Sequence, residues 1–254
     1  MLEINGLTKS YKGGKKAVDN VSLHVDSGDI FGFIGHNGAG KSTTIRCIVG
    51  VLGFDEGDIF VDGVSVRDNP LEAKKRIAYI PDNPDIYDYL TGIQYLTFIA
   101  DIFDIPKSAR GERIDRYAKA FEIEGDLGRL ISSYSHGMKQ KLCLIGALMH
   151  EPKLLVLDEP FVGLDPKSAH TLKEFMRETC SNGGAIFFST HVLPVAETLC
   201  NRIAVIKSGR IIAQGDTAKI KGDSSLENVF WSLRNNEKAW LGFGTLPQKP
   251  VRYK

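Results

Sequence analysis

Short segments of the first half of the chain alternate between apolar and polar residues or are apolar throughout, which is typical of β-strands. VSLHV (21–25) alternates, DIFGFIG (29–35) is a continuous apolar run, and DIFVDGVSV (58–66) carries an Asp-Gly turn between two strand-like halves. RIAYIP (76–81) is a further apolar run that ends at a proline. A β-rich layer is therefore predicted before the first long helices.

Between about residues 89 and 150, apolar residues recur at the three- and four-residue spacing of helices. GIQYLTFIADIF (92–103) and RIDRYAKAFEI (113–123) follow this spacing, and Pro106 and the stretch 125–128 are the expected breaks. A third helix is predicted after Ser135, with an apolar face made of Met138, Leu142, Ile145 and Met149. The pattern predicts a helical subdomain inserted between strands.

Strands return after this helical stretch. KLLVLDEP (153–160) and GAIFFSTH (184–191) are almost continuously apolar, as expected of parallel strands covered on both faces by helices such as one predicted over 167–181. RIAVIKSGRIIAQG (202–215) predicts two more strands. The order of elements indicates an α/β fold. A short helix, SLENVFWSL (225–233), is predicted before a Gly-, Pro- and Lys-rich end that we expect to be poorly ordered.

Composition narrows the classes of function. The chain is 43% hydrophobic and 25% charged over 254 residues, as in ordinary globular proteins. Its 32 basic and 31 acidic side chains are well mixed and leave a formal charge of +1. Because no basic tail or basic surface stripe is indicated, no nucleic acid is expected as a partner.

Two further features indicate a cytoplasmic protein. The four cysteines are far apart and form no C-x-x-C pair, which favours reduced, buried thiols over a disulfide framework or a zinc site. No run approaches the roughly 18 apolar residues of a membrane helix, and no signal-like segment is expected at the start of the chain. If the protein acts at a membrane, a separate chain must span it.

The segment GHNGAGKST (35–43) matches the phosphate-binding pattern G-x-x-x-x-G-K-[ST] and lies between a predicted strand and a predicted helix, where this motif occurs. Its glycines let several backbone N–H groups face a phosphate, Lys41 supplies a positive charge, and the Ser42 hydroxyl is suited to bind Mg²⁺. The predicted phosphate-binding residues are Gly35, His36, Asn37, Gly38, Ala39, Gly40, Lys41, Ser42 and Thr43.

Two carboxylates, Asp158 and Glu159, follow the apolar run LLVL. They are expected at the carboxyl end of the sheet, where open α/β folds bind ligands. Asp158 would hold Mg²⁺, and Glu159 would orient and deprotonate the water that attacks the terminal phosphate. Alone, such a pair is more often a solvated strand end; the phosphate loop makes the functional interpretation credible.

Three other positions could contribute to the same chemistry. His191 follows the strand-like AIFFST and could donate to a phosphate oxygen, although a lone histidine is more often structural. Asp165 lies in PFVGLDP and is predicted to cap a helix, to face a ligand from a stiff loop, or both. At Ser135, unpaired N–H groups of His136, Gly137 and Met138 would suit an anion, although an isolated start of this kind is usually only a capped helix.

The order of these motifs resembles one family, the nucleotide-binding subunits of ABC transporters, over about residues 2 to 215. The resemblance implies a P-loop NTPase core of ABC type at about 1–82 and 151–215, with an N-terminal antiparallel β-subdomain, an inserted α-helical subdomain at about 83–150, and a short tail at 216–254. It further implies a cytoplasmic ATPase on the inner face of the cell membrane.

The resemblance also implies ATP and Mg²⁺ as cofactors and assigns roles to single residues. Tyr11 would stack on adenine, Glu159 would be the catalytic base, His191 would be the switch histidine and Asp165 would lie in the dimer loop. Ser135, His136, Gly137 and Met138 would form a signature motif that binds ATP held by a second ATPase subunit. Dimer closure would drive transport, with export the expected direction, through separate transmembrane permease subunits.

The sequence departs from the family pattern at two places. The usual signature Leu-Ser-Gly-Gly-Gln reads Tyr-Ser-His-Gly-Met here, so that His136 could crowd a phosphate or donate to it. Asp82 replaces the usual glutamine of the Q-loop in AYIPDNPD. Since a carboxylate can bind a metal, Asp82 is expected near Mg²⁺ with Ser42 and Asp158.

The segment DIYDYLTGIQYLTF (85–98) is rich in aromatic and aliphatic residues. It could form a groove for a helix of the membrane subunit or could simply pack the helical subdomain. A soluble ABC ATPase that acts on a macromolecular complex is the alternative function, but no long coiled coil or basic stripe favours it. A P-loop kinase or GTPase is disfavoured, because such a protein would not need the helix cap at Ser135 far beyond the phosphate loop, and the chain has no guanine-reading N-K-x-D segment.

Overall fold

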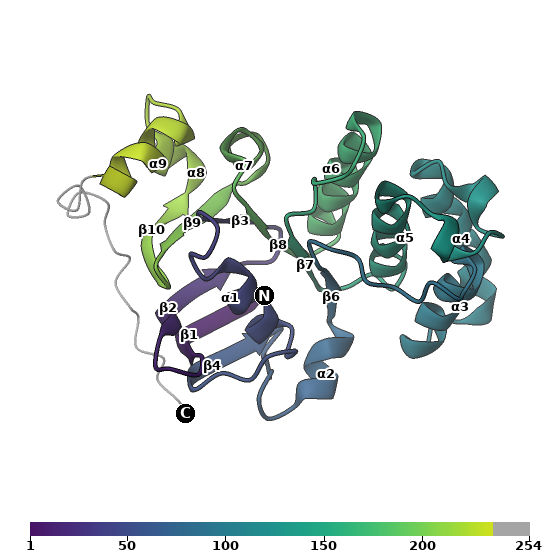
Figure 1. The fold of residues 1–254 in the computed structure, drawn as a ribbon, viewed down its shortest axis with the longest axis horizontal. Helices are drawn as coiled ribbons and strands as arrows, with labels where there is room; N and C mark the ends of the chain where they lie inside the picture. Colours follow the sequence, from purple (N-terminus) through teal and green to yellow (C-terminus); the bar gives the residue numbers. More distant parts are fainter. Residues whose placement is uncertain (236–254) are drawn as a thin grey trace.

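The computed structural model describes residues 1–235. The end of the chain that was predicted to be poorly ordered follows residue 235 and lies outside the described residues. Two sheets organise the fold (Figure 1). The first is an antiparallel sheet of strand order β2-β1-β4-β5. Its strands are β1 (Leu2–Ser10), β2 (Lys16–Val25), β4 (Glu56–Val61) and β5 (Val64–Ser65). The predicted β-rich layer at the start of the chain is thus confirmed, including the turn between β4 and β5.

The second sheet has the order β10-β9-β3-β8-β7-β6. Neighbouring strands from β9 to β6 are parallel, whereas β10 pairs antiparallel with β9. The strands are β3 (Ile30–Ile34), β6 (Ile77–Ile80), β7 (Leu154–Asp158), β8 (Ala185–Thr190), β9 (Arg202–Lys207) and β10 (Arg210–Asp216). Parallel pairing brings the carboxyl ends of β3, β7 and β8 to one edge of the sheet, which positions the site described below.

The parallel strands read as continuous apolar runs because both faces of the sheet are buried. In β3, Phe31 and Phe33 pack into one hydrophobic cluster with the antiparallel sheet and α1 (Lys41–Ile48). Ile30 and Ile34 pack into the other cluster, with residues of α5 (His136–Leu148), α6 (Pro166–Ser181) and α7 (Leu193–Leu199). The predicted α/β fold, with a parallel sheet covered on both sides, is confirmed.

The predicted helical stretch is α3 (Gly92–Ile102), α4 (Lys107–Ala120) and α5, with two 3₁₀ turns at Glu124–Asp126 and Ile131–Ser133. Figure 1 shows α3, α4 and α5 together at one end of the molecule, beyond α6 from the antiparallel sheet. The remaining helices are α2 (Pro70–Lys75), α8 (Thr217–Lys221) and α9 (Leu226–Asn235).

Two details of the helices differ from the sequence pattern. Helix α4 begins at Lys107, six positions before the predicted range 113–123, because its first turns have few apolar residues to reveal them. Helix α5 is buried well beyond the predicted apolar face, since even the amide of Gln140 is fully buried and has no hydrogen-bond partner among the described residues. More of the surface of α5 is therefore buried than the spacing of its apolar residues predicted.

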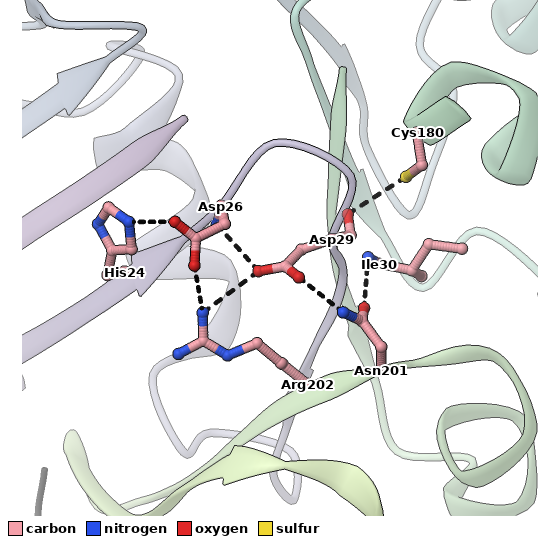
Figure 2. Close-up of polar contacts among 7 residues, drawn as sticks. All are labelled: His24, Asp26, Asp29, Ile30, Cys180, Asn201 and Arg202. Atoms are coloured by element: carbon pink, nitrogen blue, oxygen red, sulfur yellow. Dashed lines mark hydrogen bonds and ion pairs between the residues drawn. The ribbon is translucent and has the colours of Figure 1, made fainter. Parts of the chain in front are cut away.

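A polar network joins the two sheets at the edge opposite the carboxyl ends (Figure 2). Asp29 is 6% exposed and accepts hydrogen bonds from Asn201 Nδ2 at 2.6 Å and from the backbone N–H of Asp26 at 2.9 Å. Asn201 Oδ1 in turn accepts from the N–H of Ile30 at 2.8 Å, and Arg202 lies between Asp26 and Asp29. These contacts pin the turn before β3 to the start of β9.

The cysteines are consistent with the prediction from their spacing. Cys47, Cys143, Cys180 and Cys200 are all free thiols, three of them buried and Cys180 half-buried. Burial raises the pKa of the Cys47 and Cys180 thiols to about 11 and that of Cys143 to about 12. These side chains are protonated packing residues at neutral pH.

Candidate functional site

A cavity of about 360 Å³ lies at the carboxyl edge of the mixed sheet, between the loop that joins β3 to α1 and the end of β7. The structure brings many of the predicted phosphate, metal and catalytic residues to this cavity. Its lining residues are Ala17, His36, Asn37, Gly38, Gly40, Lys41, Ser42, Thr43, Asp82, Asp158 and Glu159. Gly35 and Ala39 complete the loop beneath them.

The glycines of the loop are required by its shape. Gly40 adopts φ 113°, and a Cβ atom there would lie 2.5 Å from the carbonyl oxygen of Ala17. A Cβ atom on Gly35 would lie 2.7 Å from the carbonyl oxygen of Ile206. Because only glycine fits these positions, the backbone can wrap around the start of α1 and direct its N–H groups into the cavity, a cradle that fits a phosphate.

Lys41 is only 6% exposed, and its ammonium group is held at the bottom of the cavity. Nζ donates to the carbonyl oxygens of Gly35 at 2.7 Å and His36 at 3.4 Å, and lies 3.6 Å from Glu159 Oε1. A charge buried this deeply must be satisfied by acceptors, and the loop supplies them. The ammonium is thereby fixed where a phosphate would enter.

Asp158 and Glu159 lie where the run LLVL predicts them, at the end of β7. Asp158 is 2% exposed and accepts a hydrogen bond from the hydroxyl of Ser189 on β8. The N–H of Glu159 donates to the carbonyl (3.3 Å) and hydroxyl (3.2 Å) oxygens of the same serine. Glu159 adopts φ 49°, a left-handed conformation that costs a non-glycine residue about 1 kcal/mol or more and is often found at functional sites.

Ser189 is a residue that the sequence analysis missed. Asp158 pairs with Ser189 in the parallel register of β7 and β8. Because this register depends on how the two strands pair, neither segment alone could have indicated Ser189. Ser189 holds the side chain of Asp158 and the backbone of Glu159 at once. It therefore fixes the side chain of Asp158 relative to the backbone of Glu159.

His191 lies next to Glu159. Its Nδ1 is 2.9 Å from Glu159 Oε1, and its backbone N–H donates to Oε2 at 3.3 Å. The ring is 52% exposed, so its other face is open toward solvent and a ligand. The sequence prediction that His191 and Glu159 share one edge of the sheet is confirmed by this contact.

The predicted metal residues Ser42, Asp82 and Asp158 all line the cavity. Asp82 is exposed, and one of its oxygens accepts from the N–H of Asn83 at 2.9 Å. Among residues 1–235, no three His, Cys, Asp or Glu side chains come close enough to hold a metal ion by themselves. The buried carboxylate of Asp158 and the Ser42 hydroxyl fit Mg²⁺ as a partial ligand set that phosphate oxygens would have to complete.

Tyr11 lies beside the far end of the loop. It is 47% exposed, and its phenol oxygen is 3.3 Å from Thr43 Oγ1. An exposed aromatic ring next to the phosphate loop is suited to contact a base whose phosphates the loop binds.

Ser135 caps α5 as predicted: its hydroxyl accepts from the N–H of Met138 at 3.2 Å. The expectation that the Met138 N–H is unpaired is therefore wrong, because the cap satisfies it, and this leaves those of His136 and Gly137 facing outward. None of the four signature residues is among the described residues that line the cavity around Lys41. The start of α5 thus lies outside the cavity that contains the phosphate loop of its own chain.

Asp165 caps α6, which confirms one of its two predicted roles. Its carboxylate accepts from the Ser168 N–H at 2.9 Å and lies 2.9 Å from Lys141 Nζ on α5. These hydrogen bonds, first that from the Ser168 backbone, hold the pKa of Asp165 well below its usual value. The apolar face predicted for this helix does not include Lys141, and its link between α5 and α6 was not predicted.

A second, largely apolar cavity of about 430 Å³ opens between β6 and helices α3 and α5. His150 lines it with its ring stacked on Phe103, centroids 3.7 Å apart, and burial lowers the pKa of His150 to about 4. Segment 85–98 contains both buried and exposed aromatic residues. Tyr95 is buried in the helical subdomain, whereas Tyr89 is 74% exposed.

No helix within residues 1–235 is long and apolar enough to cross a membrane. The family model described as ABC transporter matches residues 18–162. The ABC-type transporter ATP-binding protein EcsA of Bacillus subtilis is 32% identical over 93% of this chain and 98% of its own length.

Two solved structures agree with this match. A structure described as the ATP-binding subunit of an ABC transporter is 33% identical, covers 92% of this chain and 99% of its own, and superposes with a TM-score of 0.89. A dimeric bacterial ABC transporter cassette, MJ0796, is 23% identical over 85% of this chain and 99% of its own with a TM-score of 0.77, and shows the fold alone. With the phosphate loop, the carboxylate pair and the capped helix α5 in place, the chain belongs to the ABC transporter family as an ATP-binding subunit.

Proposed function

We propose that this chain hydrolyses ATP with Mg²⁺ and couples hydrolysis to transport through separate membrane subunits. The observation that supports it is the meeting of Lys41, Asp158 and Glu159 in one cavity above the phosphate loop, with His191 in contact with Glu159. A cation for the phosphates, a buried metal carboxylate and a positioned base are the groups that phosphoryl transfer to water requires.

The residues divide this work by position. The N–H groups of loop 35–43 and the Lys41 ammonium bind the phosphates, while Tyr11 and Thr43 face the nucleoside end. Ser42 and Asp158 would hold Mg²⁺, with Asp82 as a further acidic group at the rim; when bound, the ion neutralises charge on the phosphate oxygens.

Glu159 serves as the general base. Its Oε1 is buried between His191 Nδ1 and Lys41 Nζ and accepts no well-directed hydrogen bond within the described residues. A buried carboxylate oxygen with unused acceptor capacity, positioned between the Lys41 ammonium and the His191 ring, is suited to accept the hydrogen of an attacking water. Ser189 and His191 fix its direction.

We further propose that two subunits meet around two ATP molecules. Ser135, His136, Gly137 and Met138 lie outside the chain's own phosphate cavity, and the positive end of α5 is directed outward. Phosphate oxygens of ATP held by a second copy or a related subunit would complete the contact, with Asp165 beside the interface. The solved cassette MJ0796 is described as dimeric, which supports this arrangement.

The membrane partner is proposed to dock at the apolar cavity between β6, α3 and α5. Exposed aromatic residues lie before and within α3: Tyr87 packs against Tyr89 and Phe98, with ring centroids 5.8 and 5.6 Å apart. A patch of this kind on a protein surface usually marks an interaction site. Docking at this patch would place the protein in the cytoplasm on the inner face of the membrane. Because segment 81–92 resembles export-type subunits, export is the proposed direction of transport.

The proposed division of the chain follows from the same elements. Residues 1–82 and 151–215 would form the ATPase core with its β-subdomain, because both sheets lie there. Residues 83–150 would form the helical subdomain that carries α3, α4 and α5, and 216–254 a short tail.

The test compares the wild-type chain with Glu159→Gln. The wild type should release phosphate from Mg·ATP, and Glu159→Gln should lower turnover by on the order of 10² to 10⁴ while it retains ATP binding. With Mg·ATP, Glu159→Gln should also double in mass by light scattering and co-purify from detergent extract with a multi-spanning protein. If Glu159→Gln turns over ATP at the wild-type rate, Glu159 is not the general base. If the variant co-purifies with a soluble macromolecular complex, the non-transport alternative is favoured.

A further inference from the structure

The loop 159–165, which begins at the proposed base, is anchored at both ends. At its start, Ser189 holds the Glu159 N–H. At its end, Asp165 caps α6 and pairs with Lys141 on α5. Between these anchors lies Gly163, which is exposed and adopts φ 83°. A glycine in the left-handed region has wide conformational freedom, so the middle of the loop needs a contact of its own to stay in one conformation.

That contact comes from the first turn of α5. A Cβ atom on Gly137 would lie 2.8 Å from the carbonyl oxygen of Gly163, so the two backbones approach to a distance that only glycine permits. A Cβ atom on Gly163 would lie 2.7 Å from Cδ2 and 3.1 Å from Nε2 of His136. The His136 ring therefore fills the space beside Gly163 in which another residue would carry its side chain.

This placement bears on an alternative that the sequence left open. His136 could crowd a phosphate at the start of α5 or donate to it, yet its ring lies against the loop of its own chain. We propose that His136 is a positioning residue for hydrolysis, whose ring holds Gly163 and thereby fixes loop 159–165 and the orientation of Glu159. The proposal rests on the proposed function, in which Glu159 is the base.

The expected effect follows from how steeply catalysis depends on geometry. A misplacement of about 1 Å in a reacting group can cost on the order of 10²-fold in rate. Loop 35–43, which binds the phosphates, is a separate segment, and His136 is not among the described residues that line its cavity. Loss of the ring should therefore lower turnover and leave the affinity for ATP nearly unchanged.

The experiment uses the purified full chain and three variants. His136→Gly removes the ring, and His136→Phe keeps an aromatic ring of similar shape without its nitrogens. His170→Ala alters an exposed histidine on α6 outside the site and is the matched control. For each protein, kcat and KM for Mg·ATP are measured together with amide hydrogen exchange in residues 160–165.

His136→Gly should lower kcat about tenfold, leave KM within about twofold and speed exchange in the loop by about fivefold or more, because the contact that orders Gly163 is lost. His136→Phe should restore kcat and exchange to within about threefold of wild type, and His170→Ala should match wild type. Recovery by a ring without nitrogens is the sign of a positioning role.

Two results would overturn the proposal. If both His136 variants lose turnover equally while loop exchange stays at the wild-type rate, the imidazole nitrogens act directly at a phosphate. If His136→Gly leaves both quantities unchanged, the ring does not order the loop. If the wild-type chain does not hydrolyse ATP, the proposed function is contradicted instead. Amide hydrogen exchange still tests the contact between His136 and the loop in that case, because it does not depend on turnover.

Discussion

His191 holds both carboxylate oxygens of Glu159: its Nδ1 lies 2.9 Å from Oε1, and its backbone N–H donates to Oε2 at 3.3 Å. Both residues follow parallel strands, β7 and β8, that pair in register. One residue thus controls the direction of the carboxylate through its ring and its backbone. Substitution of the ring leaves the backbone contact in place, which separates the two contributions experimentally.

We expect His191→Ala to lower kcat about tenfold to hundredfold, because Glu159 loses one of the groups that orient it. The affinity for ATP should stay within about threefold, since Lys41 and the phosphate loop are untouched. Steady-state turnover and equilibrium nucleotide binding measure the two quantities. A kcat within twofold of wild type, with His170→Ala as control, would contradict this role for the ring.

Asp82 should make ATP binding unusually dependent on Mg²⁺. Without the ion, three carboxylates line one cavity and repel the phosphates, whereas Asp82→Gln removes one of those charges. Because Asp82 is exposed, the difference should be modest, about fivefold or ~1 kcal/mol. The ATP affinity of both proteins is measured with Mg²⁺ and with a chelator. Equal Mg²⁺ dependence in wild type and Asp82→Gln would exclude the effect; Asp85→Asn, outside this cavity, is the control.

Gly40→Ala should abolish tight ATP binding. A Cβ atom there would lie 2.5 Å from the Ala17 carbonyl oxygen, in a backbone conformation of φ 113° that side chains disfavour. Strain of about 2–3 kcal/mol should distort the loop and weaken affinity more than tenfold. Gly53→Ala, where no atom lies within 4 Å of the added Cβ, is the matched control and should bind like wild type. Nucleotide titration that gave equal affinities would argue against this account of the loop.

His150 should make stability depend on pH. Burial lowers its pKa from 6.5 to about 4, so between these values the unfolded chain takes up a proton that the folded chain does not. The stabilisation is complete above pH 6.5 and is lost as the pH falls toward 4, by up to about 3 kcal/mol. Urea unfolding of wild type and His150→Phe at pH 7 and pH 5 measures it. The variant should lose less stability on acidification, and parallel losses would show that His150 does not contribute; His170→Phe is the control.

Asn201→Ala should destabilise the fold without touching the site. The change removes the bonds to Asp29 (2.6 Å) and Ile30 (2.8 Å) seen in Figure 2 and leaves a buried carboxylate short of a donor. We expect a loss of about 2–3 kcal/mol in unfolding free energy with ATP affinity unchanged, because the network lies at the opposite end of β3 from the phosphate loop. Asn228→Ala, on an exposed part of α9, should stay within about 0.5 kcal/mol of wild type. A loss of similar size in both variants would count against the network.

The elements that could be predicted are those whose signal is local. The phosphate loop is a contiguous motif, and the apolar run before Asp158 marks a buried strand whose end must reach the edge of the sheet. The caps at Ser135 and Asp165 depend on a side chain and an N–H three residues apart, so the sequence contains both partners. Helix α4 shows the limit, because the six positions at its start contain a single small apolar residue, Ala109, and carry no periodic signal.

The sequence by itself determined the family, the α/β order of elements and most residues of the cavity, because each is encoded within a few consecutive positions. Only the tertiary structure decided how those positions meet. Ser189 reaches Asp158 through strand register, and Lys141 reaches Asp165 because α5 packs beside α6. The sequence likewise did not predict that the His136 ring lies against Gly163. The physical reason is that such contacts join segments tens of residues apart, whose approach is set by burial of the whole core rather than by either segment alone.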